Sequence, residues 1–440
     1  MSDPVRGAAV RVAATRAIAA VRFEGASLKA TLPSALAGFD DSRDRALCEA
    51  ICFEACRWTL RYEALLGLLM PRPLQRSLRI IHALLLAGLA QLDAMQLAEY
   101  AAISSTAEAA RGLRQPRYVG LVNAVLRRYV RERDALHAAL ANHPIAVHAH
   151  PLWLAQTLHR DWGEASAAIL TENNRAAPVW LRVNQAQITR DTYRATLAAA
   201  ALQPQTCDYA PDALRLEQGV IATRLPGWDG GQVSVQDLSA QLTVEALAAQ
   251  RGERVLDACA APGGKSAHVL ERTSGLAQLI AMDIDEQRLT RVRESLDRLR
   301  LRATLRSGDA ATPTAWWDGR AFDRILIDAP CSGTGVIRRQ PDIKLHRRAA
   351  DLPAMTALQA RLLDALWPLL RTGGRLVYAT CSVLKDENEH QIDAFLARTP
   401  DAHPVALPDH FGRVSGAGRQ RFPGEDGGDG FFHAALEKIV

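Results

Sequence analysis

Two cysteines follow strand-like segments of this sequence, and their surroundings indicate chemistry. Cys331 comes directly after residues 325–330 (ILIDAP), which contain the acid Asp328, and Cys381 comes directly after residues 376–380 (LVYAT). Both segments predict β-strands, so we expect both thiols at the same edge of a sheet. Two thiols beside a carboxylate are typical of covalent catalysis, in which a thiolate attacks an electrophilic ring.

A pyrimidine ring suits such a pair of thiols. Carbon 5 of cytosine is a poor nucleophile, but thiolate addition at carbon 6 makes the ring an enamine that accepts a methyl cation. An acid hydrogen bonded to ring nitrogen 3 assists the addition, and a base must then remove the carbon-5 proton before the thiol leaves. One cysteine would be the nucleophile and a second group would assist release; the residues alone leave the assignment open.

A glycine-rich turn, DACAAPGGKS, indicates a second ligand. Gly263 and Gly264 allow close approach of the backbone just before a predicted helix. The turn matches neither a phosphate-binding Walker loop nor the full dinucleotide fingerprint. Asp283 ends the next predicted strand, about twenty residues further on, where an acid binds ribose hydroxyls. With Asp309 after a third strand, and Asp328, the pattern favours a nucleoside without phosphates, such as S-adenosylmethionine, over three helix caps.

Strands and helices alternate across residues 236–440, which predicts a doubly wound, mostly parallel sheet with ligands at the carboxyl ends of its strands. Residues 1–145 have almost purely helical patterns, and residues 146–235 predict a small α/β module. The predicted strands of the last region are 254–260, 279–284, 303–310, 324–330 and 375–382, and its predicted helices are 266–272, 286–300, 354–370 and 387–397.

Composition narrows the class of protein. A chain of 440 residues with 48% hydrophobic residues predicts two or three folded domains and excludes a disordered protein. No apolar run is long enough to span a bilayer, and the N-terminus lacks the pattern of a signal peptide, so we expect a cytoplasmic protein without a membrane partner. Seven cysteines, an odd number, favour free thiols. Cys48, Cys52 and Cys56 share one helix face and fit no common zinc spacing, so we predict small buried side chains and no metal.

Basic residues are the candidates for nucleic-acid contact. The net charge is +5, and only five of the 53 basic residues are lysines. Lys265, in the glycine turn, is expected to orient Asp328 or the turn itself. Other basic residues lie near the end of a predicted helix or follow the Cys331 segment. The alternative interpretation is that they form a solvated basic surface without contacting RNA. We predict RNA contacts from Arg127, Arg128, Arg338, Arg339 and Lys344.

Four segments resemble the RNA cytosine-C5 methyltransferase family. They are DACAAPGGKSAHVLE, AMDIDEQRL, FDRILIDAPCSGTGVIRRQPDIKLHR and LVYATCSVLKDENEHQI. The N-terminal region, with GLVNAVLRR, is similar to the antitermination factor NusB. The resemblance covers essentially all 440 residues. It implies a multidomain protein with an all-α NusB-like domain, a small α/β middle module, and a Rossmann-like methyltransferase domain.

The resemblance also implies residue roles. The family's nucleophile corresponds to Cys381, and the cysteine assigned to product release corresponds to Cys331. DNA cytosine methyltransferases use the Pro-Cys cysteine instead, so Cys381 favours RNA over DNA. Glycines 333 and 335 are interpreted as leaving the loop flexible to admit a flipped base. The implied cofactor residues are Cys259, Ala260, Ala261, Pro262, Gly263, Gly264, Lys265, Asp283, Asp309 and Asp328, with Asp328 and Lys265 also in the catalytic set.

The hypothesis is therefore S-adenosylmethionine-dependent methylation of carbon 5 of a cytosine in small-subunit (16S) ribosomal RNA, by a monomer. The helical domain and the middle module would bind and orient the RNA. One alternative is a transfer RNA cytosine-C5 methyltransferase. Another is an RNA-binding or antitermination factor with an inactive methyltransferase domain, although every expected site position is filled.

Overall fold

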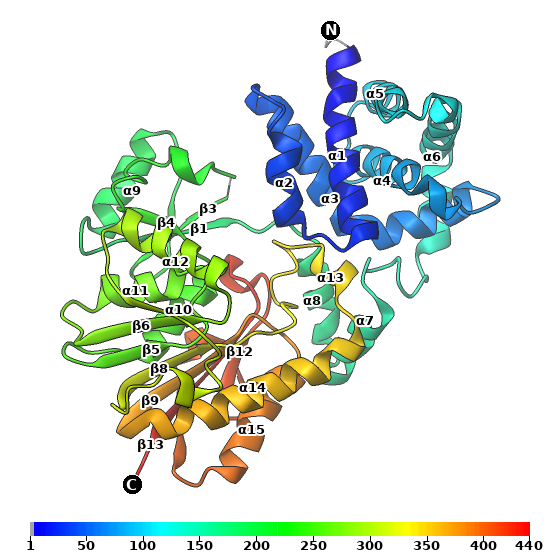
Figure 1. Cartoon of the computed structure of the whole chain (residues 1–440). Coiled ribbons are helices and arrows are strands. Elements are labelled where there is room, and N and C mark those ends of the chain that lie inside the picture. The colour runs from blue at the N-terminus through cyan, green and yellow to red at the C-terminus, as the bar shows by residue number, and fades with distance from the viewer. Residues whose placement is uncertain (1–3, 218) are drawn as a thin grey trace. The chain divides into compact units, whose positions relative to one another are not determined.

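The computed structural model describes residues 4–217 and 219–440, which divide between two compact units (Figure 1). The first unit runs to Arg175 and also takes in Ile337–Ala349. The second unit consists of Ala176–Val336 and Ala350–Val440. The chain therefore leaves the second unit shortly after Cys331. The thirteen residues Ile337–Ala349 belong to the first unit, and the chain returns to the second unit at Ala350.

The first unit is helical, as predicted. Ser27 and Asp41 cap two of its helices by accepting hydrogen bonds from the backbone N–H groups of Ala30 and Arg43. Its helices are α1 (Pro4–Glu24), α2 (Leu28–Leu36), α3 (Ser42–Leu69), α4 (Arg79–Leu92), α5 (Glu99–Gly112), α6 (Val119–Leu140), α7 (Leu152–Trp162), α8 (Ala165–Asn173) and the short α13 (Ile343–His346). In the described part of the chain, no helix is both long and apolar enough to cross a membrane.

The core of this unit includes the three cysteines that share one helix face. Cys48, Cys52 and Cys56 on α3 are at most 1% exposed and lie among the apolar residues of α1 and α4. The prediction of small buried side chains is confirmed. Small alanine and cysteine side chains let the helices of this core approach each other closely.

The second unit begins with a small antiparallel sheet of strand order β2-β3-β1-β4. Leu181 and Leu214 of its strands bury one face against Tyr193 and Leu197 of a helix. Its elements are β1 (Val179–Val183), α9 (Arg190–Ala199), β2 (Gln205–Thr206), β3 (Ala213–Leu216) and β4 (Val233–Val235). These elements account for residues 176–235 of the α/β module predicted over 146–235, whereas residues 146–175 contain α7 and α8 and group with the helical unit.

A larger sheet completes the second unit, with strand order β11-β12-β13-β9-β8-β5-β6-β7 and β10 paired with β13. The run from β7 through β6, β5 and β8 to β9 is parallel. Its helices are α10 (Leu238–Leu247), α11 (Gly264–Arg272), α12 (Glu286–Leu299), α14 (Leu352–Leu366) and α15 (Glu389–Arg398). Its strands are β5 (Arg254–Asp257), β6 (Gln278–Asp283), β7 (Thr304–Ser307), β8 (Phe322–Asp328), β9 (Leu370–Thr380), β10 (Ala402–Val405), β11 (Arg413–Ser415), β12 (Gly418–Arg421) and β13 (Phe431–Lys438).

The parallel strands are covered on both faces, which confirms the doubly wound prediction. Side chains of α10, α11 and α12 pack on one face, and those of α14 and α15 pack on the other. Because both faces are buried, the middle residues of the central strands, such as Ile325–Ile327 of β8, are consecutively apolar rather than alternating. Asp285 caps α12 by accepting from the N–H groups of Gln287 and Arg288.

The antiparallel end of this sheet was not predicted. After α15 the chain forms the strands β10 to β13 without an intervening α-helix, and β13 pairs antiparallel with β9. β13 (FFHAALEK) is buried over most of its length, since it lies inside the sheet between β9 and β12. Its apolar run is short enough to fit a buried strand or a helix segment, so pattern alone does not assign it.

Candidate active site

A pocket of about 230 Å³ opens at the carboxyl ends of the parallel strands. Residues at or just after the ends of β5, β6, β7, β8 and β9 all contribute to its lining, as expected for ligand sites in open α/β sheets. The lining residues are Ala258, Cys259, Ala261, Asp283, Ile284, Arg288, Gly308, Asp309, Ala310, Asp328, Ala329, Pro330, Cys331, Leu358, Leu362 and Cys381. The structure thus brings together seven of the residues that were singled out from the sequence.

The glycine turn shapes one wall of this pocket through its backbone. Gly263 has φ +101°, and a Cβ at this position would lie 3.0 Å from Cα of Val292. The N–H of Ala260 donates to the carbonyl of Met282 at 2.7 Å, which ties the turn to β6. Predicted residues Ala260, Pro262, Gly263 and Gly264 are not among the lining residues; they set the path of the turn.

Asp283 and Asp309 line the pocket, and neither is the N-cap residue of the helix that follows it. Asp283 is 3% exposed, and its carboxylate accepts from the N–H of Ala261 in the glycine turn at 3.3 Å. Asp309 accepts from the N–H of Ala311 at 2.9 Å within its own loop. Both carboxylates line the pocket, so they are available to ribose hydroxyls and to the polar edge of a base.

Two arginines that the sequence analysis did not single out face these acids. Arg288 on α12 lies 3.3 Å from the carboxylate of Asp283, and Arg361 on α14 lies 3.2 Å from that of Asp309. Arg288 follows the Asp285 cap by three positions, so it projects from the first turn of α12 toward the sheet edge. That spacing from the cap was a usable signal; no sequence pattern linked Arg361 to Asp309.

The two thiols lie side by side. The Sγ atoms of Cys331 and Cys381 are 3.4 Å apart, and both residues are partly exposed at the pocket. The hydrogen bond with Cys381 and burial raise the pKa of Cys331 well above its usual value. Cys331 therefore stays a thiol at neutral pH and is poised to donate its hydrogen toward the sulfur of Cys381.

An ion pair accompanies the thiols. Nζ of Lys265 lies 2.6 Å from Oδ2 of Asp328 and 5.1 Å from the ring centre of Phe431. Burial acts to lower the pKa of Lys265, but the charge and hydrogen bond of Asp328 raise it above its ordinary value. Lys265 thus remains an ammonium that holds the Asp328 carboxylate in place, and the predicted contact between the two is confirmed.

The glycines after Cys331 do not loosen the loop, contrary to the interpretation from sequence. Gly333 and Gly335 are buried, and the N–H of Gly335 donates to the carbonyl of Cys381 at 2.9 Å. A Cβ at Gly335 would lie 2.1 Å from the carbonyl oxygen of Gly430. Glycine is required here because two backbone segments cross closely, not because the loop must move.

The predicted RNA contacts divide into exposed and buried side chains. Arg127 donates to Asn123 on α6, and Arg128 pairs with Glu132 while donating to the carbonyl of Leu69 at 2.9 Å. Both are partly available to a ligand, since Arg128 keeps 40% of its side chain exposed and the Arg127 contact is at the surface.

Arg338 and Lys344 need correction as phosphate contacts. They are 4% and 1% exposed, because the segment Ile337–Ala349 packs into the helical unit instead of lying on a basic surface. Nζ of Lys344 donates to Oδ1 of Asn174 at 2.6 Å, and burial lowers its pKa well below the usual value. Arg339 is half-buried.

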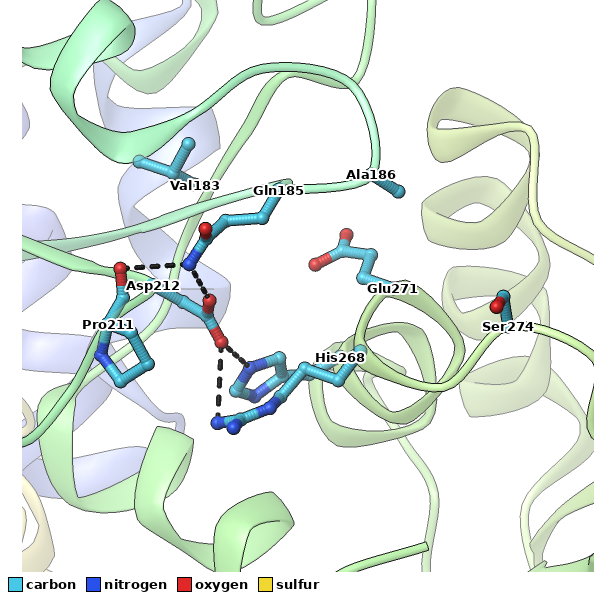
Figure 2. Close-up of a pocket in the computed structure, with 9 residues that line it drawn as sticks. Val183, Gln185, Ala186, Pro211, Asp212, His268, Glu271 and Ser274 are labelled. Atoms are coloured by element: carbon cyan, nitrogen blue, oxygen red, sulfur yellow. Dashed lines mark hydrogen bonds and ion pairs between the residues drawn. The ribbon is translucent and has the colours of Figure 1, made fainter. Parts of the chain in front are cut away.

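A second pocket, of about 520 Å³, lies between the small sheet and α11 (Figure 2). Asp212 accepts from His268 at 2.9 Å and from Gln185, and it lies 3.5 Å from Arg272. The side chains of Gln185 and His268 point toward Asp212 (Figure 2). Burial lowers the pKa of His268 to about 4, so its ring is neutral. Asp212 is paired with three neighbours, whereas Nδ1 of His268 is buried without a hydrogen-bond partner among the described residues; none of the site residues predicted from the sequence lines this pocket.

The fold and the main pocket define a multidomain protein with a Rossmann-like methyltransferase domain. Family comparisons agree: the NusB family matches residues 8–131, the RsmF/B-like ferredoxin-like domain matches 150–223, and 16S rRNA methyltransferase RsmB/F matches 244–437. Proteins named ribosomal RNA small subunit methyltransferase B are 52% identical in Xanthomonas campestris pv. campestris and 44% identical in Escherichia coli O9:H4, each match covering 98% of both chains. The chain belongs to the ribosomal RNA small subunit methyltransferase B family.

Solved structures share the fold. The structure of PH0851 aligns with a TM-score of 0.81 over 100% of both chains at 20% identity. NSun6 from Pyrococcus horikoshii, determined with SFG, aligns with a TM-score of 0.60 at 21% identity, covering 67% of this chain and 100% of that one. These comparisons confirm the predicted family and fold class. The family consists of RNA methyltransferases that depend on S-adenosylmethionine.

Proposed function

We propose that this protein methylates carbon 5 of a cytosine in small-subunit ribosomal RNA through a covalent adduct with Cys381. The observation that carries the proposal is the 3.4 Å separation of the two thiols, at a pocket that also contains Asp328. One thiol is held as an acid by its neighbours, and the other is free to act as a nucleophile. Ribosomal RNA as the substrate is supported by the names of the relatives.

The residues around the glycine turn fit S-adenosylmethionine. Cys259 and Ala261 of the turn line the pocket, which offers Asp283 for ribose hydroxyls and Asp309 for the adenine edge. Bound there, S-adenosylmethionine supplies a methyl group to a carbon nucleophile. The related fold of NSun6 from Pyrococcus horikoshii was determined with SFG, an analogue of that molecule.

The chain's own groups then have distinct roles. The Cys381 thiolate adds to carbon 6 of the ring, which forms the S–C6 bond and pushes an electron pair toward carbon 5. Asp328, positioned by Lys265, takes up a proton when the ring binds, donates it to ring nitrogen 3 as the S–C6 bond forms, and so assists that addition. After methylation, a base takes the proton from carbon 5, the C5–C6 double bond returns, and the S–C6 bond breaks with Cys381 leaving as a thiolate. The adjacent Cys331 thiol assists this release by donating its hydrogen toward the departing sulfur.

RNA binding is assigned to the helical unit and the small sheet module. Arg127, Arg128 and Arg339 remain as proposed phosphate contacts, whereas Arg338 and Lys344 are excluded by burial. The target cytosine must be unstacked, since carbon 6 is hidden inside a duplex. Because ribosomal RNA is the proposed substrate, we infer that the protein works in the cytoplasm and does not act on DNA.

The test uses the wild type, Cys381→Ala and Cys331→Ala, each incubated with small-subunit ribosomal RNA and labelled S-adenosylmethionine. Methyl incorporation is measured, and a denaturing gel reveals any RNA–protein adduct. We expect Cys331→Ala to accumulate the adduct and Cys381→Ala to give neither adduct nor product. Attachment that survives in Cys381→Ala and disappears in Cys331→Ala would reverse the two roles.

The same assay discriminates the alternatives. Transfer RNA in place of ribosomal RNA should give no methylation if the ribosomal assignment is correct. Calorimetric titration with S-adenosylmethionine distinguishes an enzyme from an inactive RNA-binding factor. Binding that is lost in Asp283→Ala supports the enzyme, and an absence of binding in the wild type contradicts it.

A further inference from the structure

Glu387 lies behind the two active-site thiols and has no exposed surface. It ends the short 3-10 helix Lys385–Glu387 between β9 and α15. Its Oε1 accepts from the backbone N–H of Ser332 at 2.7 Å and from Nε2 of Gln359 at 3.3 Å. Its Oε2 accepts from the hydroxyls of Ser332 at 2.5 Å and of Ser382 at 2.6 Å.

These donors belong to the two turns that carry the thiols. Ser332 directly follows Cys331, and Ser382 directly follows Cys381. Gln359 also donates to the carbonyl of Pro330 at 2.9 Å, so the Cys331 turn is held on both sides of the thiol. Both oxygens of Glu387 therefore accept hydrogen bonds from Ser332, next to Cys331, and Oε2 also accepts from Ser382, next to Cys381. The Glu387 carboxylate thus links the two turns directly.

A carboxylate suits this position and an amide does not. A carboxylate only accepts hydrogen bonds, and all four of its neighbours here are able to donate. In Glu387→Gln one oxygen becomes an NH₂ group. Placed at Oε1 it would face two N–H donors, and placed at Oε2 it would force two hydroxyls to reverse. Either arrangement weakens the link between the turns, because buried donors then lose their acceptor.

We propose that Glu387 is a positioning residue that fixes the separation of the Cys331 and Cys381 thiols by binding the residue that follows each of them. The proposal rests on the proposed function for its catalytic meaning, but the positioning itself is a property of the free protein. Small displacements of reacting groups are costly, since a shift of about 1 Å can lower a rate about a hundredfold.

The charge of Glu387 has a second effect on the same pair. Besides the hydrogen bond with Cys381 and burial, the nearby Glu387 carboxylate raises the pKa of Cys331. It thereby favours the state in which Cys331 is a thiol while Cys381 attacks. The pH dependence of Cys331 reactivity is thus a readout that a purely structural role would leave unchanged.

The experiment measures how fast the two thiols join in the folded protein. Diamide oxidises them: each thiol loses its hydrogen, an S–S bond forms, and the azo group of diamide is reduced to a hydrazine. The Cys331–Cys381 disulfide is quantified by peptide mass spectrometry over time. The variants are Glu387→Gln, Glu387→Ala and Ser382→Ala, and the matched control is Glu253→Gln, which removes a partly buried acid paired with Arg324 before the start of β5.

We expect the initial disulfide rate to fall about threefold in Glu387→Gln and about tenfold or more in Glu387→Ala, with a smaller fall in Ser382→Ala. Glu253→Gln should match the wild type. Alkylation of Cys331 by iodoacetamide should have its pH midpoint shifted downward in Glu387→Gln. In the methylation assay kcat should fall by a similar factor while KM for S-adenosylmethionine stays within about twofold.

Unchanged or faster disulfide formation in folded Glu387→Gln, or an unshifted alkylation midpoint, would overturn the proposal. If Glu387→Ala does not fold, Glu387→Gln and Ser382→Ala still decide it. The disulfide assay contains neither RNA nor S-adenosylmethionine. A wild type that fails to methylate cytosine would therefore contradict the proposed function alone, and loss of thiol juxtaposition in the variants would still support the positioning role.

Discussion

At the scale of single residues, charge is concentrated beside the thiols in one ion pair. Lys265 and Asp328 lie 2.6 Å apart at the pocket, and the lysine is mostly buried. Lysine is rare in this chain, so its presence here rather than arginine is informative. A compact ammonium contacts one carboxylate oxygen and leaves the other available, whereas a guanidinium fork would engage both.

Lys265→Met should lower kcat for methylation by about tenfold to a hundredfold, because Asp328 loses the cation that orients it. Lys265→Arg should restore only part of the rate, since the fork is larger and binds differently. The measurement is single-turnover methylation of small-subunit ribosomal RNA. Lys438→Met is the control: Lys438 donates to the carbonyls of Trp367 and Leu370, away from the pocket, and its rate should equal that of the wild type.

At the scale of elements, the two cysteine turns are joined through their backbones. The N–H of Gly335 donates to the carbonyl of Cys381, and the N–H of Gly430, just before β13, donates to the carbonyl of Gly335. β13 pairs with β9, the strand that leads to Cys381. The unpredicted antiparallel strand thus supports both turns of the active site.

Gly335→Ala should destabilise the protein by about 1–3 kcal/mol, because the new Cβ would meet backbone that has no room to move. Gly120→Ala is the matched control: nothing lies within 4 Å of a Cβ there, and the position is inside α6. Alanine at this helical site should stabilise by about 0.5–1 kcal/mol. Urea unfolding measures both changes, and equal midpoints for the two variants would contradict the close crossing at Gly335.

At the scale of the whole molecule, buried titratable groups set the response to acid. Burial lowers the pKa of His268 to about 4 and of His433 to about 3, and it lowers that of His150 well below its usual value. Burial raises the pKa of Asp257 to about 6. The histidines lie in both units, so acid acts on the whole chain.

Stability should therefore fall as the pH decreases from about 6.5 to about 4. In this window the unfolded chain protonates the three histidines and the folded chain does not, so each contributes a loss of up to about 1.4 kcal/mol per pH unit. Asp257 acts in the opposite direction below about pH 6, because the folded state then binds a proton that the unfolded state lacks. Urea unfolding at several pH values measures the slope. Asp257→Asn should make it steeper, and a slope that is flat or reversed in the wild type would contradict the assignment.

The sequence by itself determined which residues meet at the sheet edge. Asp283, Cys331 and Cys381 each end or follow a largely apolar strand-like run, Asp309 follows a more polar one, and parallel strands bring such positions together. The glycine turn was predictable for the same local reason. The rarity of lysine in the chain also singled out Lys265, with Asp328 or the glycine turn as its predicted partner.

Only the tertiary structure decided the contacts between distant segments. Glu387 binds Ser332 across 55 positions, and Lys344 enters the helical unit to reach Asn174 across 170 positions. Nothing in the local pattern of charges separates a buried lysine from an exposed one, because burial depends on which surfaces meet. The sequence thus specifies the chemistry that is available at the strand ends. Packing between segments decides which side chains position the reactive groups. It also decides which charged side chains, such as Lys344, are buried and therefore cannot contact RNA.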